Sequence, residues 1–276
     1  MSLRGKLELY GLTDVGLRRG HNEDSIRHDL SMGLAVLADG MGGYKAGEVA
    51  SDMAVSVIME EVRRELNDAR PEQEDGESSY ARGSLMLREA IRKGNEAIYD
   101  AARDRAECQG MGTTLVAALF YDNRVSIAHV GDSRVYRLRH GAFEQLTVDH
   151  SLIQELVDKG FYTPEEAAKS VQRNLVTRAM GVDPTVREDL QEQPVLPGDL
   201  YLLCSDGLSD LVADQDIHLT LAEHSANLAQ AADILVQMAN RKGGTDNISV
   251  LLAKALRPFP ARSGHSWYSR VIHWFS

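Results

Sequence analysis

The spacing of the β segments in the middle of the chain constrains the fold more than any other feature. The segments TTLVAALF, VSIAHV, RVYRLR and AFEQLT follow one another between residues 113 and 147, separated only by short polar turns. Such a turn can join two antiparallel strands, whereas parallel strands need a crossover of about a dozen residues or more. The spacing therefore predicts antiparallel sheets and argues against a doubly wound parallel sheet.

Further strand segments lie toward both ends of the chain, and helical segments separate them. LELYGL, DSIRH and GLAVLAD occur within residues 7–39, and LYLLCSD and NISVLLAKAL occur within residues 200–256. Apolar residues at helical spacing predict helices over residues 47–66, about 80–107 and about 226–241. Strands and helices grouped in this way predict an α+β fold.

The segment over about 150–185 interrupts the β pattern. Ser151 and Gln154 have the spacing of a capping box, and Gly160 is suited to end the helix that they begin. The sequence TPEE at 163–166 is a second helix start, with Pro at the first helical position. We therefore expect a small helical insertion between β segments.

The composition of the chain excludes several classes of protein. With 276 residues, of which 43% are hydrophobic, the chain can bury a sizeable core. A net charge of −11 repels phosphate backbones, so we expect no nucleic-acid binding. We find no signal peptide and no apolar run that could span a bilayer, so we expect a cytoplasmic protein. Cys108 and Cys204 form no CxxC motif, and Cys204 should pack as a small apolar residue.

Several apolar runs end on, or begin after, a carboxylate beside a small residue. One such acid is explained by a turn, because Asp can bond its own backbone there. A group of unpaired carboxylates at sheet ends would repel one another and favour a bound cation. All the ligands would be oxygen, which suits Mg²⁺, Mn²⁺ or Ca²⁺ and makes a poor zinc site. The acids are Glu23, Asp24, Asp39, Asp132, Asp206 and Asp246.

Other residues near these acids indicate phosphate chemistry. Arg19 lies four residues before Glu23, and a guanidinium can hold a phosphate through two parallel hydrogen bonds. On its own, Arg19 would be interpreted as part of a surface salt bridge. We find no Walker A loop, no Gly-x-Ser-x-Gly motif and no cysteine nucleophile loop. A metal-activated water is the nucleophile that remains.

These motifs together resemble the metal-dependent protein phosphatases, the type 2C Ser/Thr phosphatases, in their compact bacterial form. Seven motifs in the family's order span the chain to about residue 256, which makes the resemblance specific. They are DVGLRRGHNEDS (14–25), LADGMGGYKAGEVAS (37–51), GTTLVAA (112–118), HVGDSRVYRL (129–138), LTVDHSL (146–152), LCSDGLSD (203–210) and GGTDNISVLL (243–252).

The resemblance implies a β-sandwich of two antiparallel sheets flanked by helix pairs on both sides, a four-layer αββα fold. It implies a catalytic domain over 1–256, with the insertion at about 150–185 as a flap beside the active site, followed by a tail over 257–276. Two Mn²⁺ or Mg²⁺ ions would bind at one end of the sandwich, with room for a third.

The resemblance also assigns roles to individual residues. Arg19 would bind the phosphate, and Asp24 would orient a metal-bound water. The remaining assignments are metal ligands: Asp39 as the bridging ligand, Glu23 and the Gly40 carbonyl for one ion, Asp206 and Asp246 for the other, and Asp132 for a third, weaker ion.

The implied activity is hydrolysis of phosphoserine and phosphothreonine in proteins by a metal-activated water, without a phosphoenzyme. The partners would be phosphoproteins made by a Ser/Thr kinase, and we expect a monomer. Some family members carry His after Asp-Gly to protonate the leaving oxygen, where this chain has Met41. A metal-bound water or His21 is the alternative acid. His129 and His150 are interpreted as structural.

Two other functions stay open at this point. The same fold could recognise a phosphoprotein without hydrolysing it, which loss of the metal-site acids would favour. A different metallohydrolase would act on small phosphate esters. The tail ends in WYSRVIHWFS, which as a helix would gather aromatic residues on one face. Packing on the body or on another copy is the simpler interpretation, and docking to a membrane surface or a partner is the alternative.

Overall fold

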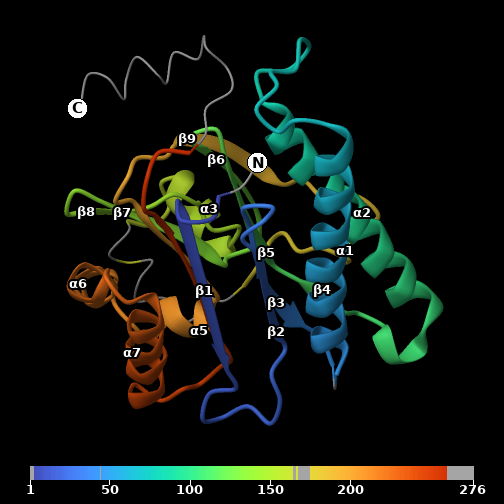
Figure 1. Ribbon diagram of the computed structural model, residues 1–276. Coiled ribbons are helices and arrows are strands. Elements are labelled where there is room, and N and C mark those ends of the chain that lie inside the picture. Colours follow the sequence, from blue (N-terminus) through green and yellow to red (C-terminus); the bar gives the residue numbers. More distant parts are fainter. Residues whose placement is uncertain (1–2, 44, 164–165, 167–174, 260–276) are drawn as a thin grey trace.

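Two antiparallel β-sheets form the centre of the molecule (Figure 1). The computed structural model describes residues 3–43, 45–163, 166 and 175–259. In strand order, the first sheet consists of β1 (Leu7–Asp14), β11 (Ile248–Ala255), β10 (Leu200–Cys204), β7 (Arg134–Arg139) and β8 (Ala142–Gln145). The second consists of β2 (Asp24–Asp29), β3 (Leu34–Met41), β5 (Leu115–Tyr121), β6 (Arg124–Val130) and β9 (Asp189–Pro194), with β4 (Gly112–Thr113) paired to β3.

Helices cover the outer face of each sheet, which gives four layers. The pair α1 (Ala46–Asp68) and α2 (Arg82–Asp104) packs on the second sheet, and the pair α6 (Asp214–His224) and α7 (Leu228–Arg241) packs on the first. The predicted α+β sandwich flanked by helix pairs is therefore confirmed. The short elements are η1 (Ala106–Cys108), α3 (Leu152–Asp158) and α5 (Asp206–Ser209).

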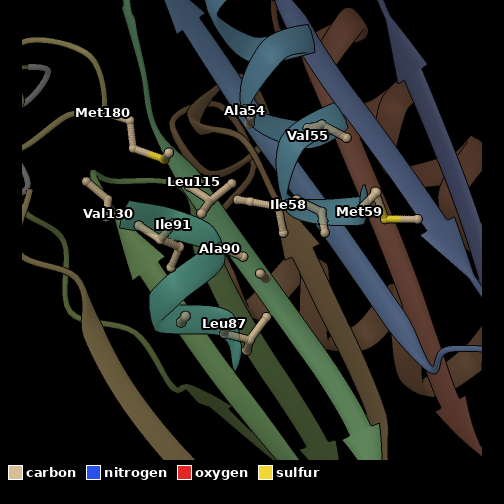
Figure 2. Packing of buried hydrophobic residues seen from close by; sticks show 14 of the residues in the cluster. Ala54, Val55, Ile58, Met59, Leu87, Ala90, Ile91, Leu115, Val130 and Met180 are labelled. Carbon is tan, nitrogen blue, oxygen red and sulfur yellow. The ribbon is translucent and has the colours of Figure 1, made fainter. Parts of the chain in front are cut away.

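The central strands are apolar on both faces because each face lies against another layer. In β3, Val36 and Ala38 pack toward α1 and α2, whereas Leu37 packs between the two sheets. Figure 2 shows the outer layer, in which Ile58 of α1 and Ile91 of α2 lie together near Leu115 of β5. A strand that is buried on both faces has a continuous apolar sequence, and this pattern identified these strands in the sequence.

Two elements of the structure have no clear signal in the sequence. β9 (DLQEQP) is an edge strand, and all of its residues are partly exposed. Because neither face of the strand is fully buried, its sequence lacks the alternation of apolar and polar residues that would mark a strand. In α6, Ile217, Leu219 and Leu221 alternate as they would in a strand. Only Ile217 and Leu221, four residues apart, are buried, because the helix turns Leu219 toward solvent.

The predicted helix starts of the insertion have capping hydrogen bonds. The Ser151 side chain accepts a hydrogen bond from the backbone N–H of Gln154 (3.3 Å) at the start of α3. The Thr163 N–H donates to the Glu166 carboxylate (2.8 Å), and the Glu166 N–H donates to Thr163 Oγ1 (3.2 Å), as in a capping box. The remainder of this second predicted helix lies outside the described residues.

The chain stays packed on the sandwich beyond β11. The backbone N–H of Phe259 donates to Asn123 Oδ1 (2.6 Å), and its ring lies 6.5 Å from that of Phe120 between centroids. The aromatic segment predicted at the end of the tail lies outside the described residues. Among the helices that the structure describes, none combines the length and apolar character needed to cross a membrane.

Replacing Ile58 with Ala tests the outer core layer. The side chain is fully buried between α1, α2 and the second sheet, so the substitution leaves a cavity. We expect the free energy of unfolding, measured with urea, to fall by about 3 kcal/mol. Leu219→Ala, at an exposed position of α6, is the control and should change it by less than about 0.5 kcal/mol. Equal losses in both variants would contradict the described packing.

Candidate metal centre

Carboxylates carried by both sheets meet at one end of the sandwich. Asp24 begins β2 and is the register partner of Asp39 near the end of β3. Asp206 follows β10 as the first residue of α5, and Asp246 lies just before β11. Asp132 lies in the turn between β6 and β7. Charge interactions link these five carboxyl groups, so the structure brings together acids that lie far apart in the sequence.

Burial and repulsion between acids raise the pKa of four of these groups, Asp24, Asp39, Asp132 and Asp206. Removal from water is the largest cause of the raised pKa of Asp39 and Asp206, and the charges of neighbouring acids raise it further. Burial likewise raises the pKa of Asp24 to about 6 and that of Asp132 to about 6. A cation among these carboxylates would remove the repulsion and favour their charged form.

Three carboxylate oxygens at this end of the sandwich are buried and accept no hydrogen bond from the protein. They are Glu23 Oε1, Asp24 Oδ1 and Asp206 Oδ1. A buried acceptor without a donor costs about 1–3 kcal/mol, and more when it is charged. Hard divalent cations bind carboxylate oxygens of this kind, so the residues present fit Mg²⁺ or Mn²⁺.

Glycine is required after Asp39 because backbone segments approach closely there. A Cβ on Gly40 would lie 2.1 Å from the Gly47 carbonyl oxygen and 2.6 Å from that of Glu23. A Cβ on Gly47 would lie 2.9 Å from the carbonyl carbon and 2.9 Å from the carbonyl oxygen of Gly40. These contacts are too short for any side chain, so both glycines allow α1, β3 and the Glu23 segment to meet.

Arg19 lies at the edge of the carboxylate cluster. Its guanidinium donates a hydrogen bond to Asp246 Oδ2 (2.7 Å) and lies 4.0 Å from Glu23 Oε2. This hydrogen bond is the main cause of the raised pKa of Arg19. The side chain keeps 47% of its surface exposed, so the guanidinium can also be reached from solvent. Arg19 does form a salt bridge, but with acids of the candidate site.

Asn247 is a supporting residue that the sequence reasoning missed. Its buried side chain accepts a hydrogen bond from the Glu23 N–H (2.7 Å) and donates to the carbonyl oxygens of Val15 and His21 (3.0 Å each). It thereby attaches the segment that carries Arg19 and Glu23 to the start of β11. The position directly after Asp246 was the one signal available in the sequence.

Ser205 supports Asp24 in a similar way and was also missed. Its hydroxyl donates to Asp24 Oδ2 (2.8 Å) and accepts from the backbone N–H of Ser249 (3.0 Å). Because Oδ2 is held in this way, the other oxygen of Asp24 is the one without a protein donor. The sequence left the general acid open between His21 and a metal-bound water, because Met41 stands where a His could serve. His21 is exposed, and the half-buried thioether of Met41 has no proton to give.

A separate group of side chains lies at the base of the insertion. Ligand atoms of His129, His150 and Asp189 approach within 4.8 Å of one another. However, His150 Nδ1 accepts from the Gly131 N–H (3.1 Å), and Arg178 Nη1 lies 3.1 Å from His150 Nε2 and 3.1 Å from Asp189 Oδ1. A guanidinium at this distance opposes a cation. The group fits the predicted structural role of both histidines, and burial lowers the pKa of His150 to about 4.

Comparison with known proteins relates this chain to bacterial phosphatases. A family model described as protein phosphatase 2C matches residues 18–253. The serine/threonine protein phosphatase PstP of Mycobacterium tuberculosis is 42% identical over 246 residues, which is 87% of this chain and 43% of that protein. The serine/threonine phosphatase Stp of Listeria monocytogenes is 38% identical over 245 residues, which is 88% of this chain and 93% of that protein. The chain thus spans less than half of the Mycobacterium protein.

Solved structures agree with this relationship. A crystal structure of the Mycobacterium tuberculosis phosphatase PstP superposes with a TM-score of 0.81 at 40% identity, covering 91% of this chain and 99% of that chain. The catalytic domain of PstP in complex with two manganese ions superposes with a TM-score of 0.77 at 39% identity, covering 91% and 99% of the two chains.

Adding Mn²⁺ to EDTA-treated protein should raise its melting temperature. At about a hundredfold excess over Kd, binding stabilises the folded state by about 2.7 kcal/mol, which corresponds to roughly 5 °C or more. Asp39→Asn should melt higher than the wild type without metal, because a buried charge is removed, and should lose the response to Mn²⁺. Asp233→Asn, at an exposed position of α7, is the control. A wild type that does not respond to Mn²⁺ or Mg²⁺ would contradict the metal centre.

Asp132→Asn should change the pH dependence of stability in the metal-free protein. The pKa of Asp132 in the folded protein is about 6, above its ordinary value of 3.8, so Asp132 lowers stability progressively as the pH rises from about 4 to about 6, and the loss is complete above that. Relative to the wild type, the variant should therefore gain stability at pH 7.5 and lose that advantage by pH 4. Urea unfolding in EDTA at both pH values measures the difference in stability between variant and wild type. A difference that does not change with pH would refute the raised pKa of Asp132.

Proposed function

Because the chain belongs to the protein phosphatase 2C family, we propose that it hydrolyses phosphoserine and phosphothreonine in proteins. The observation that carries this proposal is the group of buried carboxylates with undonated oxygens beside the half-exposed guanidinium of Arg19. Such a site combines cation ligands with a phosphate-binding group. The phosphoproteins would be products of Ser/Thr kinases, since that class of reaction forms the ester. We further propose a monomer.

Two Mn²⁺ or Mg²⁺ ions would be held by the carboxylate cluster, with a third at Asp132. When bound, these ions supply the Lewis acidity that makes water a nucleophile near neutral pH. The raised pKa values of Asp39 and Asp206 and the two manganese ions of the PstP catalytic domain support this proposal. The ligands would be Asp39 for both ions, Glu23 and the Gly40 carbonyl for one, and Asp206 and Asp246 for the other.

Arg19 and Asp24 would act on the reacting groups directly. The guanidinium of Arg19 can bind two oxygens of the phosphoryl group and offset the negative charge on them during transfer. Asp24 is held through Oδ2 by Ser205, so its Oδ1 is available to accept a hydrogen bond from water and orient it. Attack on phosphorus in line with the Ser or Thr oxygen breaks the P–O bond without a phosphoenzyme. His21, on the segment that carries Arg19, is one candidate to protonate the leaving oxygen, and a metal-bound water is the other.

We also propose that residues 1–256 form the catalytic domain and that the insertion at about 150–185 acts as its flap. The base of the insertion is anchored through His150 and Arg178 next to the turn that contains Asp132. Residues there could therefore contact a substrate bound at the carboxylates. A binding module without catalysis is disfavoured, since every acid of the implied metal site is present.

Phosphate release from a phosphothreonine peptide tests the proposed function. We expect release with Mn²⁺ or Mg²⁺ and none with EDTA. Asp39→Asn and Asp206→Asn should each lower kcat by roughly a hundredfold or more, because each removes a charged metal ligand. Asp233→Asn should retain full activity.

Two outcomes would favour one of the alternative functions instead. Folded protein that binds Mn²⁺ and the phosphopeptide without releasing phosphate would support the non-catalytic binding module. Release from small phosphate esters but not from phosphopeptides would support the alternative metallohydrolase.

A further inference from the structure

Exposed apolar side chains are grouped on two parts of the described chain, the connection between β1 and β2 and the described residues of 148–182. In the part of the chain that the structure describes, nine large apolar side chains are exposed. Two of them lie on the connection between β1 and β2, and five lie between residues 148 and 182. The other two, Leu219 and Leu256, lie on α6 and after β11. Exposed apolar surface beside a polar site is a candidate for contact with a ligand, and two of these side chains, Leu17 and Val182, lie near residues that adjoin the acids.

Leu17 lies beside the cluster on the side of the first sheet. It belongs to the connection between β1 and β2, the blue loop at the bottom of Figure 1, and its side chain is 66% exposed. Its backbone N–H donates to the carbonyl oxygen of Gly244 (2.8 Å), two residues before Asp246. Arg19, two residues after Leu17, is bonded to that same Asp246. Leu17 is therefore a neighbour of the candidate phosphate-binding group.

Val182 lies beside the cluster on the side of the second sheet. Its side chain is 57% exposed. A Cβ placed on Gly112 would lie 3.0 Å from Val182 Cγ2 and 3.6 Å from Met41 Cγ, so Val182 and Met41 lie over the same glycine. Met41 follows Asp39 by two residues on β3. An exposed apolar side chain therefore lies near the end of each sheet that carries the acids: Leu17 near the start of β11 and Val182 near the end of β3.

We propose that Leu17 and Val182 bind apolar side chains that flank the phosphorylated residue of the substrate. The inference rests on the proposed function and names the substrate class: phosphopeptides with large apolar residues next to phosphothreonine or phosphoserine. A peptide chain is the occupant that fits, because Leu17 lies on the segment that carries Arg19 and Val182 lies near Met41, two residues from Asp39. The phosphoryl group would be held between them while the flanking side chains cover Leu17 and Val182. Specificity then comes from burial of apolar surface on both sides of the reacting group.

Two matched phosphothreonine peptides test this inference, one with Leu and one with Ser on both sides of the phosphothreonine. The readout is the preference, defined as the ratio of kcat/KM for the Leu peptide to that for the Ser peptide. We expect a preference of about tenfold or more in the wild type with Mn²⁺. Leu17→Ser and Val182→Ser should each reduce it about threefold or more, and Leu17→Met should restore it. Leu219→Ser, an equally exposed position on α6, is the matched control and should keep the wild-type preference.

The same experiment distinguishes failure of the inference from failure of the proposed function. A wild type that hydrolyses both peptides equally, or variants that lose activity on both peptides in the same proportion, would overturn the inference alone. If folded protein with Mn²⁺ releases no phosphate from either peptide or from p-nitrophenyl phosphate, the proposed function fails. Fluorescence anisotropy with the two labelled peptides then measures the preference as a ratio of Kd values. A ratio near one would also overturn the inference.

Discussion

The main constraint on this structure is that it must hold mutually repelling carboxylates together, away from water. Asp24, Asp39 and Asp206 are withdrawn from water and placed near one another, which raises the pKa of each. Their charged forms oppose folding unless a cation lies among them, so a cation bound there would stabilise the folded state. The four-layer sandwich supplies the opposing free energy, because it buries apolar residues between the sheets and beneath both helix pairs.

The polar residues that hold this cluster connect the two sheets. Asn247 attaches the Glu23 segment to the start of β11, and Ser205 links Asp24 of β2 to Ser249 of β11. The bonds from Asn247 to Glu23 and from Ser205 to Asp24 each join the end of the second sheet to the end of the first, at the point where both carry acids. Because Ser205 holds Oδ2 of Asp24, the Oδ1 atom that has no protein donor keeps a fixed position, as a preformed cation site requires.

The segments that border the acids carry the groups suited to recognise a substrate. The connection between β1 and β2 carries both Arg19 and Leu17, and its shape depends on backbone bonds to Gly244 and to the Asn247 side chain. On the opposite side, the base of the insertion is fixed through His150. Rigid strand ends thus support the acids, while the connecting segments supply the charged and apolar contacts, a division common in enzymes.

The sequence by itself determined the antiparallel sheets, the helices of the long periodic segments and the acids at strand ends, because short turns, apolar periodicity and Asp-Gly pairs are local patterns. It did not reveal β9 or α6, since an edge strand lacks alternation and Ile217, Leu219 and Leu221 mimic a strand. Only the tertiary structure decided which acids share one site and which polar residues hold them. Distances between strand ends depend on how two sheets pack, and no local pattern in the chain encodes that packing.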